Sequence, residues 1–483
     1  MWEDLLPVLQ WREETVGQRA GSMPFLHGFR RIVYEYQPLV DAVLCAVGLQ
    51  EDAGTKTERS TAEDGVSDSL EEVLAREAQS AVFVEGISCA LFKVAEGGLV
   101  GAAEVLLRYG ADLNFEDPVS YYNPLHIAVL RNRPLMVRLL VQHGADVNKR
   151  DRIHESSPLD LACEEADRLP CLRVLLTLGA NVNAQDKNGK TALLHALASS
   201  DGLTVKNTDN IRLLLEGGAS VQACTSDEET VMSSLVFLVK ETFDSSDEDA
   251  AEIGRFCLCV TELLLDHGAD PSCSWSPRGP EGAGEEEEEE EEEHAEPSLT
   301  QTCLEHFDLL FPLAVLLLQR GVSLQCPRHG APCWSGPQLL LRRLEAALRE
   351  SSSAAESADL LARAEALLDL AQTCCTLTLP VEPPHPVPHP HPHPQPPPEA
   401  VLELRAQLVE QETRPPPLRL LCRRLLRRCL LPWPLEPKVR QLPLPDRLKD
   451  FLLPETSMQR RPRWDRCRPS RNPPLMRRYT PAP

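Results

Sequence analysis

The segment RLLVQHGADVN, residues 138–148, shows a pattern that recurs along the chain. It consists of several leucines, then Gly-Ala-Asp or a close variant, then an apolar residue. Such recurrence at a near-constant interval is the sequence signature of a repeat architecture. Six copies are present, the last of them degenerate, and their glycines are Gly110, Gly144, Gly179, Gly218, Gly268 and Gly321.

The intervals between these glycines predict helical repeats. The first two are 34 and 35 residues, close to the roughly 33 residues of an ankyrin unit, and the later ones of 39, 50 and 53 residues indicate insertions. A first-helix pattern precedes three copies: NPLHIA at 123–128, SPLDLA at 157–162 and TALLHA at 191–196. We therefore expect an all-α fold, an ankyrin-repeat solenoid of about six repeats, some degenerate, over residues 85–325.

Each part of the repeat has a physical role. The leucines end the second helix and face the neighbouring unit, and the glycine ends that helix because it adopts a positive φ at low cost. The hairpin that follows carries polar residues that project outward, where a protein target would bind. The candidate target-binding residues are Phe115, Glu116, Lys149, Arg150, Arg152, Gln185 and Lys187.

The sequence gives no sign of catalysis. His126 and His195 lie in the first-helix pattern, where a histidine caps a helix or bridges neighbouring loops, and neither has the spacing to a nucleophile that catalysis requires. A Gly-rich phosphate loop, a nucleophile elbow and an HExxH segment are all missing from the sequence. Cys326, His329 and Cys333 form one cluster without the second ligand pair of a zinc site. We expect no metal and no cofactor.

Charge and cysteine usage restrict the partners and the compartment. The formal net charge is −24, part of it from the nine acids of Glu285–Glu293, which argues against nucleic acid or an anionic membrane and favours a protein partner. The 16 scattered cysteines are typical of reduced thiols in the cytosol or nucleus. The N-terminal MWEDLLPVLQW lacks the basic region of a secretory signal, and no apolar run approaches the ~18 residues of a membrane span. We expect a cytoplasmic protein.

The segments outside the repeats have distinct compositions. An N-terminal segment, 1–84, contains a polar stretch at 51–70 that predicts a disordered loop. An acidic insert at 272–297 interrupts the array, and leucines at helical spacing in 338–350 and 355–371 predict a helical capping region over 326–379. A Pro/His-rich linker at 380–399, a further helix at 400–411 and a basic disordered tail at 454–483 complete the chain.

The segment PPPLRLLCRRLLRRCLLPWPLEPKVRQLPLPDRLKDFLL, residues 415–453, predicts an amphipathic helix that begins after the prolines. The apolar residues at helical spacing are Leu418, Leu421, Cys422, Leu425, Leu426 and Cys429. We expect the arginines at 419, 423, 424, 427 and 428 to lie on the opposite face and keep the helix soluble. By itself, such a helix also fits a membrane surface or a calmodulin target.

The downstream LPLPDRLKDFL, residues 442–452, decides between these readings. Two prolines alternate with leucines, and a short helix is predicted to start at Asp446 as its N-cap. Neither membrane binding nor calmodulin binding needs this second element. The remaining alternative is structural: a helix packed against the last repeat, with the proline-leucine run as a terminal arm.

Together the two elements resemble the SOCS box. Leu418 and Cys422 take the leucine and cysteine positions of its elongin-binding motif, Pro417 stands where a serine or threonine is usual, and Leu442-Pro443-Leu444-Pro445 matches its cullin motif. From about Met23, which is a second candidate start, the chain resembles the ankyrin repeat and SOCS box family. A small helical SOCS box is therefore expected to follow the repeats, within 400–453.

The resemblance implies a non-catalytic substrate receptor of a ubiquitin ligase. Elongin B and elongin C would bridge the box to cullin 5 and its RING-box protein, while the repeats hold an unknown protein target near an activated ubiquitin, leading to its ubiquitination and degradation. The implied elongin-binding residues are Pro417, Leu418, Leu421, Cys422, Leu425 and Leu426, and the implied cullin-binding residues are Leu442, Pro443, Leu444, Pro445 and Leu448. The alternative function is a non-catalytic scaffold in which the box only stabilises the fold.

Overall fold

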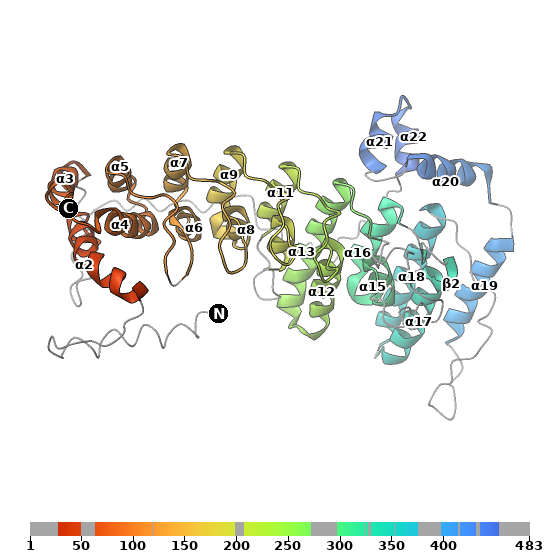
Figure 1. Cartoon of the computed structure of the whole chain (residues 1–483). Helices are drawn as coiled ribbons and strands as arrows, with labels where there is room; N and C mark the ends of the chain where they lie inside the picture. The colour runs from red at the N-terminus through yellow and green to blue at the C-terminus, as the bar shows by residue number, and fades with distance from the viewer. Residues whose placement is uncertain are drawn as a thin grey trace, which may run out of the picture. The chain divides into compact units, whose positions relative to one another are not determined.

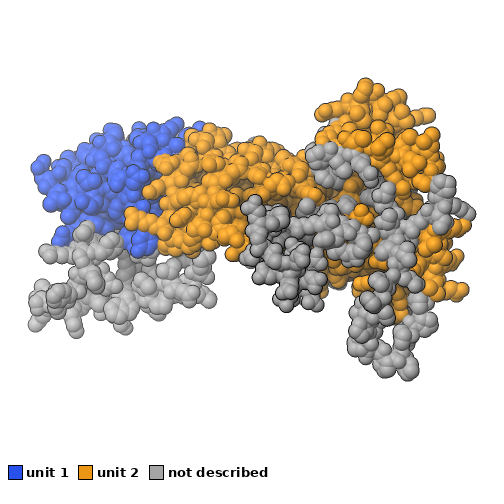
Figure 2. All heavy atoms as spheres, turned by 45° about the vertical axis from the view of Figure 1, so that its right-hand side comes forward, with its two compact units in different colours: residues 1–145 blue, residues 146–483 orange. Residues whose placement is uncertain are grey.

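The computed structural model describes residues 28–49, 63–118, 120–198, 207–271, 297–322, 324–326, 330–351, 353–374, 398–413, 416–430 and 435–453. Several predictions therefore lie outside the described residues: most of the acidic insert, most of the Pro/His-rich linker, the middle of the Cys–His cluster, the start of the 51–70 loop and the basic tail. The chain divides into two compact units, residues 1–145 and residues 146–483 (Figure 2).

Unit 1 consists of helix pairs stacked side by side. Each helix packs on the equivalent helix of the next pair, so that α2 contacts α4, α4 contacts α6, α3 contacts α5 and α5 contacts α7 (Figure 1). The helices are α2 (Gly28–Ala46), α3 (Glu63–Glu77), α4 (Phe83–Gly97), α5 (Val100–Arg108), α6 (Pro124–Leu130) and α7 (Pro134–Gln142). The stack in this unit therefore begins well before residue 85.

The prediction of a disordered loop over 51–70 was wrong for its last part. Residues 63–70 form the first half of α3, and Leu70 and Leu74 are completely buried. These two leucines lie one helical turn apart, so both face α5, against which α3 packs. The polar composition of the segment hid this short apolar stripe.

Unit 2 continues the same arrangement of pairs. Its stacked helices are α8 (Pro158–Cys163), α9 (Leu169–Thr177), α10 (Ala192–Ala198), α11 (Thr208–Glu216), α12 (Val231–Asp244), α13 (Asp247–Asp266), α15 (Leu299–Glu305), α16 (Phe307–Arg320), α17 (Gly336–Glu350) and α18 (Ala354–Cys374), with a short 3-10 helix, η2 (Ala166–Arg168), before α9. First helices pack on first helices and second helices on second helices. The α17/α18 pair packs on α15 and α16, within the region expected to cap the array.

Local sequence sets where these helices begin and end. Asn123, Ser157 and Thr230 each form a capping box at a first helix, which satisfies backbone N–H groups that lack a partner inside the helix. At the other end, all six repeat glycines have positive φ, between 83° and 102°. This confirms the predicted role of the glycine, because an ordinary side chain is disfavoured there.

The expected all-α class is confirmed, with one small exception. Strands β1 (Gln325–Cys326) and β2 (Gly330–Ser335) pair antiparallel, and an isolated bridge joins Cys224 and Thr230. After α18, helix α19 (Glu399–Thr413) packs on α17, and three helices follow: α20 (Leu418–Leu430), α21 (Leu435–Gln441) and α22 (Asp446–Leu452). In the part of the chain that the structure describes, no helix is long and apolar enough to cross a bilayer.

Candidate functional site

Helix α20 exposes a row of apolar side chains, which we call the leucine face. Leu418 is 75% exposed and Leu425 62% exposed, although both side chains are fully apolar. Contiguous apolar surface of this kind marks an interaction site in a soluble protein. The leucine face consists of Leu418, Leu421, Cys422, Leu425 and Leu426, all exposed, with the exposed Pro417 immediately before it. All six predicted elongin-binding residues are thus accessible.

The prediction that the arginines of this helix face water was wrong for two of them. Arg423 and Arg427 are only 8% and 4% exposed, and the Arg423 guanidinium lies 5.0 Å from the centre of the Phe451 ring. A polar helix face and an apolar helix face are equally visible in sequence, but the sequence does not say which one a neighbouring element covers. Here the arginine side packs inward and the leucine side is left to solvent.

Arg424 and Arg427 bind main-chain carbonyls of other helices, and we call this pair the arginine clamp. Arg427 donates from Nη1 to the carbonyl of Leu452 at 2.7 Å and from Nη2 to the carbonyl of Gln319 at 2.8 Å. Arg424 donates from Nε and Nη2 to the carbonyl of Gln372 at 3.0 and 2.6 Å. The clamp therefore fixes the first helix of the box to the last two pairs of the stack.

The accepting carbonyls lie where a cation is most favourable. Gln319 is in the last turn of α16 and Gln372 in the last turn of α18. The last carbonyls of a helix lack helical donors, and the helix dipole places negative partial charge there. Gly321, the left-handed C-cap of α16, leaves room for the clamp, because a Cβ at this position would lie 2.7 Å from Arg427 Nη2.

The predicted cullin-binding residues fall into two sets. Val439 and Leu452 form a small core of the box, and the half-buried Leu442 and Leu444 pack against it. Pro443, Pro445 and Leu448 are instead exposed, on the side chains that alternate with the leucines or follow them. Leu442 and Leu444 thus hold the loop in place, while the other three present a surface.

Asp446 is not the N-cap of the second short helix, contrary to the prediction. It is the first residue of α22, and Pro445 occupies the cap position with φ −55° and no side-chain bond to the helix. The ring of proline fixes a φ close to this value, so it can lead directly into the first turn. Asp446 still favours the helix, because its carboxylate lies at the positive end of the dipole.

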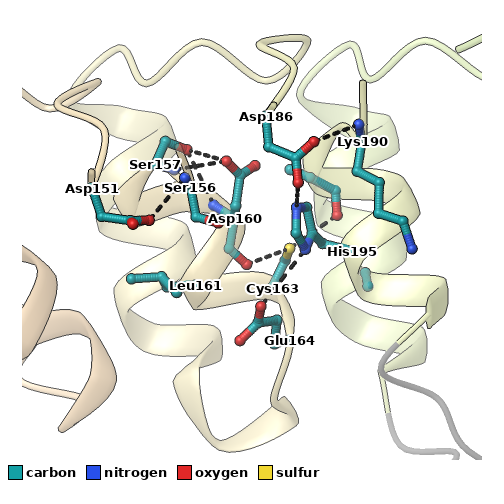
Figure 3. Close-up of polar contacts among 12 residues, drawn as sticks. Asp151, Ser156, Ser157, Asp160, Leu161, Cys163, Glu164, Asp186, Lys190 and His195 are labelled. Carbon is teal, nitrogen blue, oxygen red and sulfur yellow. Dashed lines mark hydrogen bonds and ion pairs between the residues drawn. The ribbon is translucent and has the colours of Figure 1, made fainter. Parts of the chain in front are cut away.

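The hairpins of unit 2 are built around buried aspartates (Figure 3). Asp151 accepts hydrogen bonds from the backbone N–H groups of Ile153, His154 and Ser156, at 2.7 to 2.9 Å. Asp186 accepts in the same way from the N–H groups of Asn188 and Lys190, at 2.8 Å each. Both carboxylates are nearly buried, so each one organises its own hairpin and does not face solvent.

The predicted target-binding residues are placed as follows. In unit 1, Phe115 and Glu116 are half-buried. In unit 2, Lys149 and Arg150 are half-buried, and Arg152, Gln185 and Lys187 are exposed. The five residues of unit 2 lie on two successive hairpins, before α8 and before α10.

His126 and His195 have the structural roles predicted for them. His126 completes the capping box of α6: its N–H donates to Asn123 Oδ1 at 2.9 Å, and its Nδ1 accepts from the Asn123 N–H at 3.4 Å. His195 in α10 bridges two carboxylates, with Nε2 3.2 Å from Asp186 Oδ2 and Nδ1 3.6 Å from Glu164 Oε1 (Figure 3). Burial by itself lowers the pKa of His195, but Glu164, Asp160 and Asp186 outweigh it and raise that pKa.

The group in Figure 3 also contains Cys163 near His195, but it is not an activated nucleophile. Cys163 is fully buried, and its Sγ lies 3.0 and 2.9 Å from the carbonyls of Asp160 and Ala192. Burial raises the pKa of this thiol well above its usual range. The thiol is therefore neutral, whereas the thiolate is the reactive form. Among the described residues, no cluster of His, Cys, Asp and Glu has the arrangement of a metal site.

The arginine clamp and the bonds between hairpins were not foreseen from the sequence. A signal for the clamp was present, since Arg423, Arg424 and Arg427 lie at helical spacing and share one side of α20. The bond partners gave no signal, because they are main-chain carbonyls.

Comparison with known families and proteins agrees with this organisation. A family model described as ankyrin repeats, in three copies, matches residues 62–151 and 91–186, and a model described as SOCS box matches residues 414–453. The first match starts at residue 62, so it includes α3.

The chain is also similar to three curated proteins. Ankyrin repeat and SOCS box protein 6 of Homo sapiens and that of Pongo abelii are each 52% identical to it over 443 residues, which cover 90% of this chain and 98% of the relative. Ankyrin repeat and SOCS box protein 6 of Mus musculus is 52% identical over 437 residues, or 89% of this chain and 98% of the relative.

Proposed function

The chain belongs to the ankyrin repeat and SOCS box family, and on this premise we propose that it is the substrate-recognition subunit of a ubiquitin ligase. The ligase consists of elongin B, elongin C, cullin 5 and a RING-box protein. The ankyrin repeats bind the target protein and the box docks onto elongin C and cullin 5, which leads to ubiquitination and degradation of the target. The chain itself is not catalytic.

The observation that supports this proposal most directly is the leucine face. Its side chains remain in water although the opposite side of the same helix is packed. Complete burial of a leucine side chain contributes roughly 1.5–3 kcal/mol, so covering several of them drives association. An apolar helix face is laid into an apolar groove in one common mode of protein recognition. Elongin C supplies that groove in the proposal.

The second docking surface lies in the same box. Pro443, Pro445 and Leu448 are exposed next to a loop that Leu442 and Leu444 hold against the box core. We assign the exposed three to cullin 5, with Leu442 and Leu444 as residues that position them. The leucine face and this surface belong to different helices, so one adaptor and one cullin can bind together.

The contribution to ubiquitination is proximity. A target lysine held near an activated thioester reacts as if in the same molecule, which is worth several orders of magnitude in effective concentration. The arginine clamp supports this role, because it joins the box to the stack through hydrogen bonds at two helix ends. The adaptor site therefore does not swing freely relative to the last repeats.

We place this activity in the cytoplasm. The described cysteines whose side chains are placed are free thiols, and several of them are buried. Reduced thiols are typical of intracellular proteins, because the cytosol keeps them reduced. The proposal needs this compartment, since elongins and cullins act inside cells.

Co-expression with elongin B and elongin C tests the proposal. The full chain is expected to co-purify with both, and Leu418→Asp/Leu425→Asp is expected to lose them, because a charge cannot enter an apolar groove unpaired. Leu402→Asp is the matched control, since Leu402 is 49% exposed on α19, outside the leucine face, and should retain both elongins. Failure of the unaltered chain to capture elongins would leave only a repeat-built scaffold.

A further inference from the structure

The hairpin tips of unit 2 are bonded to one another in a row. Lys187 donates from its backbone N–H to the carbonyl of His154 at 3.5 Å and from Nζ to the carbonyl of Ile153 at 2.5 Å. Ser226 donates from its N–H and its hydroxyl to the carbonyl of Asn188, at 2.9 Å each. We call residues 149–156, 184–190 and 224–229 the hairpin row. Its three tips form a single connected surface.

The first two tips carry positive charge that is not cancelled by these bonds. Arg150 donates to the carbonyl of Glu155 at 2.5 Å, and Lys187 to the carbonyl of Ile153. A carbonyl is neutral, so both side chains keep their full charge, and each has N–H groups left to donate. The aspartates of the same tips, Asp151 and Asp186, are turned inward and nearly buried.

The outward charge of these two tips is therefore positive in a chain with a net charge of −24. Their cations are Lys149, Arg150, Arg152, Lys187 and Lys190, against one exposed carboxylate, that of Glu155. Lys190 is paired with Glu229 of the third tip at 3.2 Å. Arg150 and Lys187 are held in place before any ligand arrives, which lowers the entropy lost on binding.

The third tip has the opposite charge. Asp227 and Glu228 are exposed there, so the row changes from basic to acidic over one repeat. An anionic ligand bound to the first two tips is repelled at the third. The acidic tip thus marks one end of the basic surface.

The backbone at the tips points to use rather than to stability. Glu155 and Glu228 have φ values of 55° and 67°, a left-handed conformation that side chains disfavour, whereas the middle tip has Gly189 at the equivalent place, with φ 80°. Glycine is needed in the middle, because a Cβ on Gly189 would lie 3.0 Å from the backbone nitrogen of Ser226. The outer tips hold strained, exposed side chains where glycine would fit without strain.

One apolar side chain lies between the cations. Ile153 is 44% exposed, and its carbonyl is the acceptor for Lys187. Charged recognition surfaces gain much of their affinity from such an anchor, since a buried apolar contact excludes water from the ion pairs around it. The ligand should therefore carry an apolar residue among its negative charges.

We propose that the hairpin row docks an acidic segment of the target, which crosses the first two tips with an apolar residue on Ile153 and ends before the acidic third tip. This inference rests on the proposed function and names the class of target that the repeats take. Arginine and lysine bind carboxylates and phosphates alike. The negative groups are thus glutamate and aspartate side chains or phosphorylated residues of the same segment.

Peptide binding to the full chain, purified with elongin B and elongin C, tests the inference. The probe is a fluorescein-labelled peptide of glutamates around one leucine, followed by fluorescence anisotropy at low salt. Arg150→Gln/Lys187→Gln removes two charges but keeps side chains that donate hydrogen bonds, and is expected to weaken binding about tenfold. A second probe with phosphoserines in place of the glutamates distinguishes a carboxylate site from a phosphate site by which peptide binds more tightly.

A matched control separates local docking from overall charge. Arg173→Gln/Arg212→Gln removes the same charge from exposed positions on α9 and α11 and should change the affinity by less than about twofold. Asp227→Asn/Glu228→Gln, on the third tip, should tighten binding. The inference is overturned if the glutamate and phosphoserine probes both fail to bind the unaltered chain, if the control loses as much affinity as the hairpin variant, or if polyuridylate RNA binds and displaces the peptide.

The two proposals fail in different ways. The hairpin variants leave α20 untouched, so they should retain elongin B and elongin C as the unaltered chain does. Loss of peptide with elongins retained bears on the hairpin row alone. Absence of elongins from a chain that still binds the acidic peptide would instead reject the ligase and leave the row as the binding site of a scaffold.

Discussion

Arg427 of α20 donates to the carbonyl of Gln319 at 2.8 Å, although the two residues are 108 positions apart in the chain. The same guanidinium donates to Leu452 at the end of α22. One side chain therefore holds together the last repeat helix with a glycine cap, the first box helix and the last box helix. Because the leucine face is on the exposed side of α20, this connection can be broken without altering the adaptor surface.

Removal of the clamp should loosen the box and spare the adaptor site. Arg427→Ala deletes charged hydrogen bonds to two carbonyls, each worth about 1.5–3 kcal/mol, so the free energy of unfolding should fall by about 2 kcal/mol or more. Hydrogen exchange should increase at the end of α16 and in α22, while elongin binding persists. Arg419→Ala, on the exposed part of the same helix, is the control and should cost less than about 0.5 kcal/mol.

Gly321 should be more sensitive to substitution than other repeat glycines. Gly218→Ala costs about 1 kcal/mol, because its φ is 90° but no atom lies within 4 Å of a new Cβ. Gly321→Ala adds a close approach to Arg427 Nη2 and should cost clearly more. The difference between the two glycine variants should disappear in an Arg427→Ala background, as chemical denaturation can measure. Equal costs in the unaltered background would contradict this coupling.

Leu448 should separate cullin binding from elongin binding. Leu448→Asp places a charge on an exposed surface of α22, so folding should be unaffected, and the elongins should still co-purify. Capture of cullin 5 by the chain–elongin complex should be lost. Leu135→Asp, at another strongly exposed leucine on α7, should retain cullin 5; a loss in both variants would show a general effect of added charge.

His195 should make the stability of unit 2 depend on pH above neutrality. Its pKa is raised above the usual 6.5: burial lowers it, and the carboxylates of Glu164, Asp160 and Asp186 more than offset that. The protonated form is therefore favoured in the folded state, so its stabilisation is complete below pH 6.5 and is lost as pH rises through the raised value.

Denaturation of the chain and of His195→Gln across that range measures the effect. The unaltered chain should lose stability with rising pH, with a slope of at most about 1.4 kcal/mol per pH unit, and the variant should not. Asp160 serves as an internal control, because burial raises its pKa above 3.8 and so places its own contribution at lower pH. That lower slope should survive in His195→Gln.

Much of the fold is visible in short sequence patterns, because local chemistry sets it. The glycines after each leucine run have positive φ as predicted, and Asn123 and Ser157 cap first helices at the starts of the patterns that announced them. These features depend on a few neighbouring residues. The box is visible for the same reason, since its leucines and prolines are adjacent in sequence.

What the sequence did not reveal depends on packing between distant residues. Helix α3 was hidden in a polar segment, because only Leu70 and Leu74 need to be buried by α5. The orientation of α20 was mistaken, because the partners of Arg424 and Arg427 are carbonyls 52 and 108 residues away. The bond between Lys187 and Ile153 spans 34 residues and exists only when two hairpins are stacked.

The leucine face also bears on how the chain survives when it is made alone. A patch of greasy side chains in water is a site for self-association and for capture by chaperones. Synthesis without the adaptor pair would therefore yield an orphan subunit prone to clumping, and supplying the pair should rescue its yield. The abundance of this receptor would then follow the supply of its companions rather than its own rate of production.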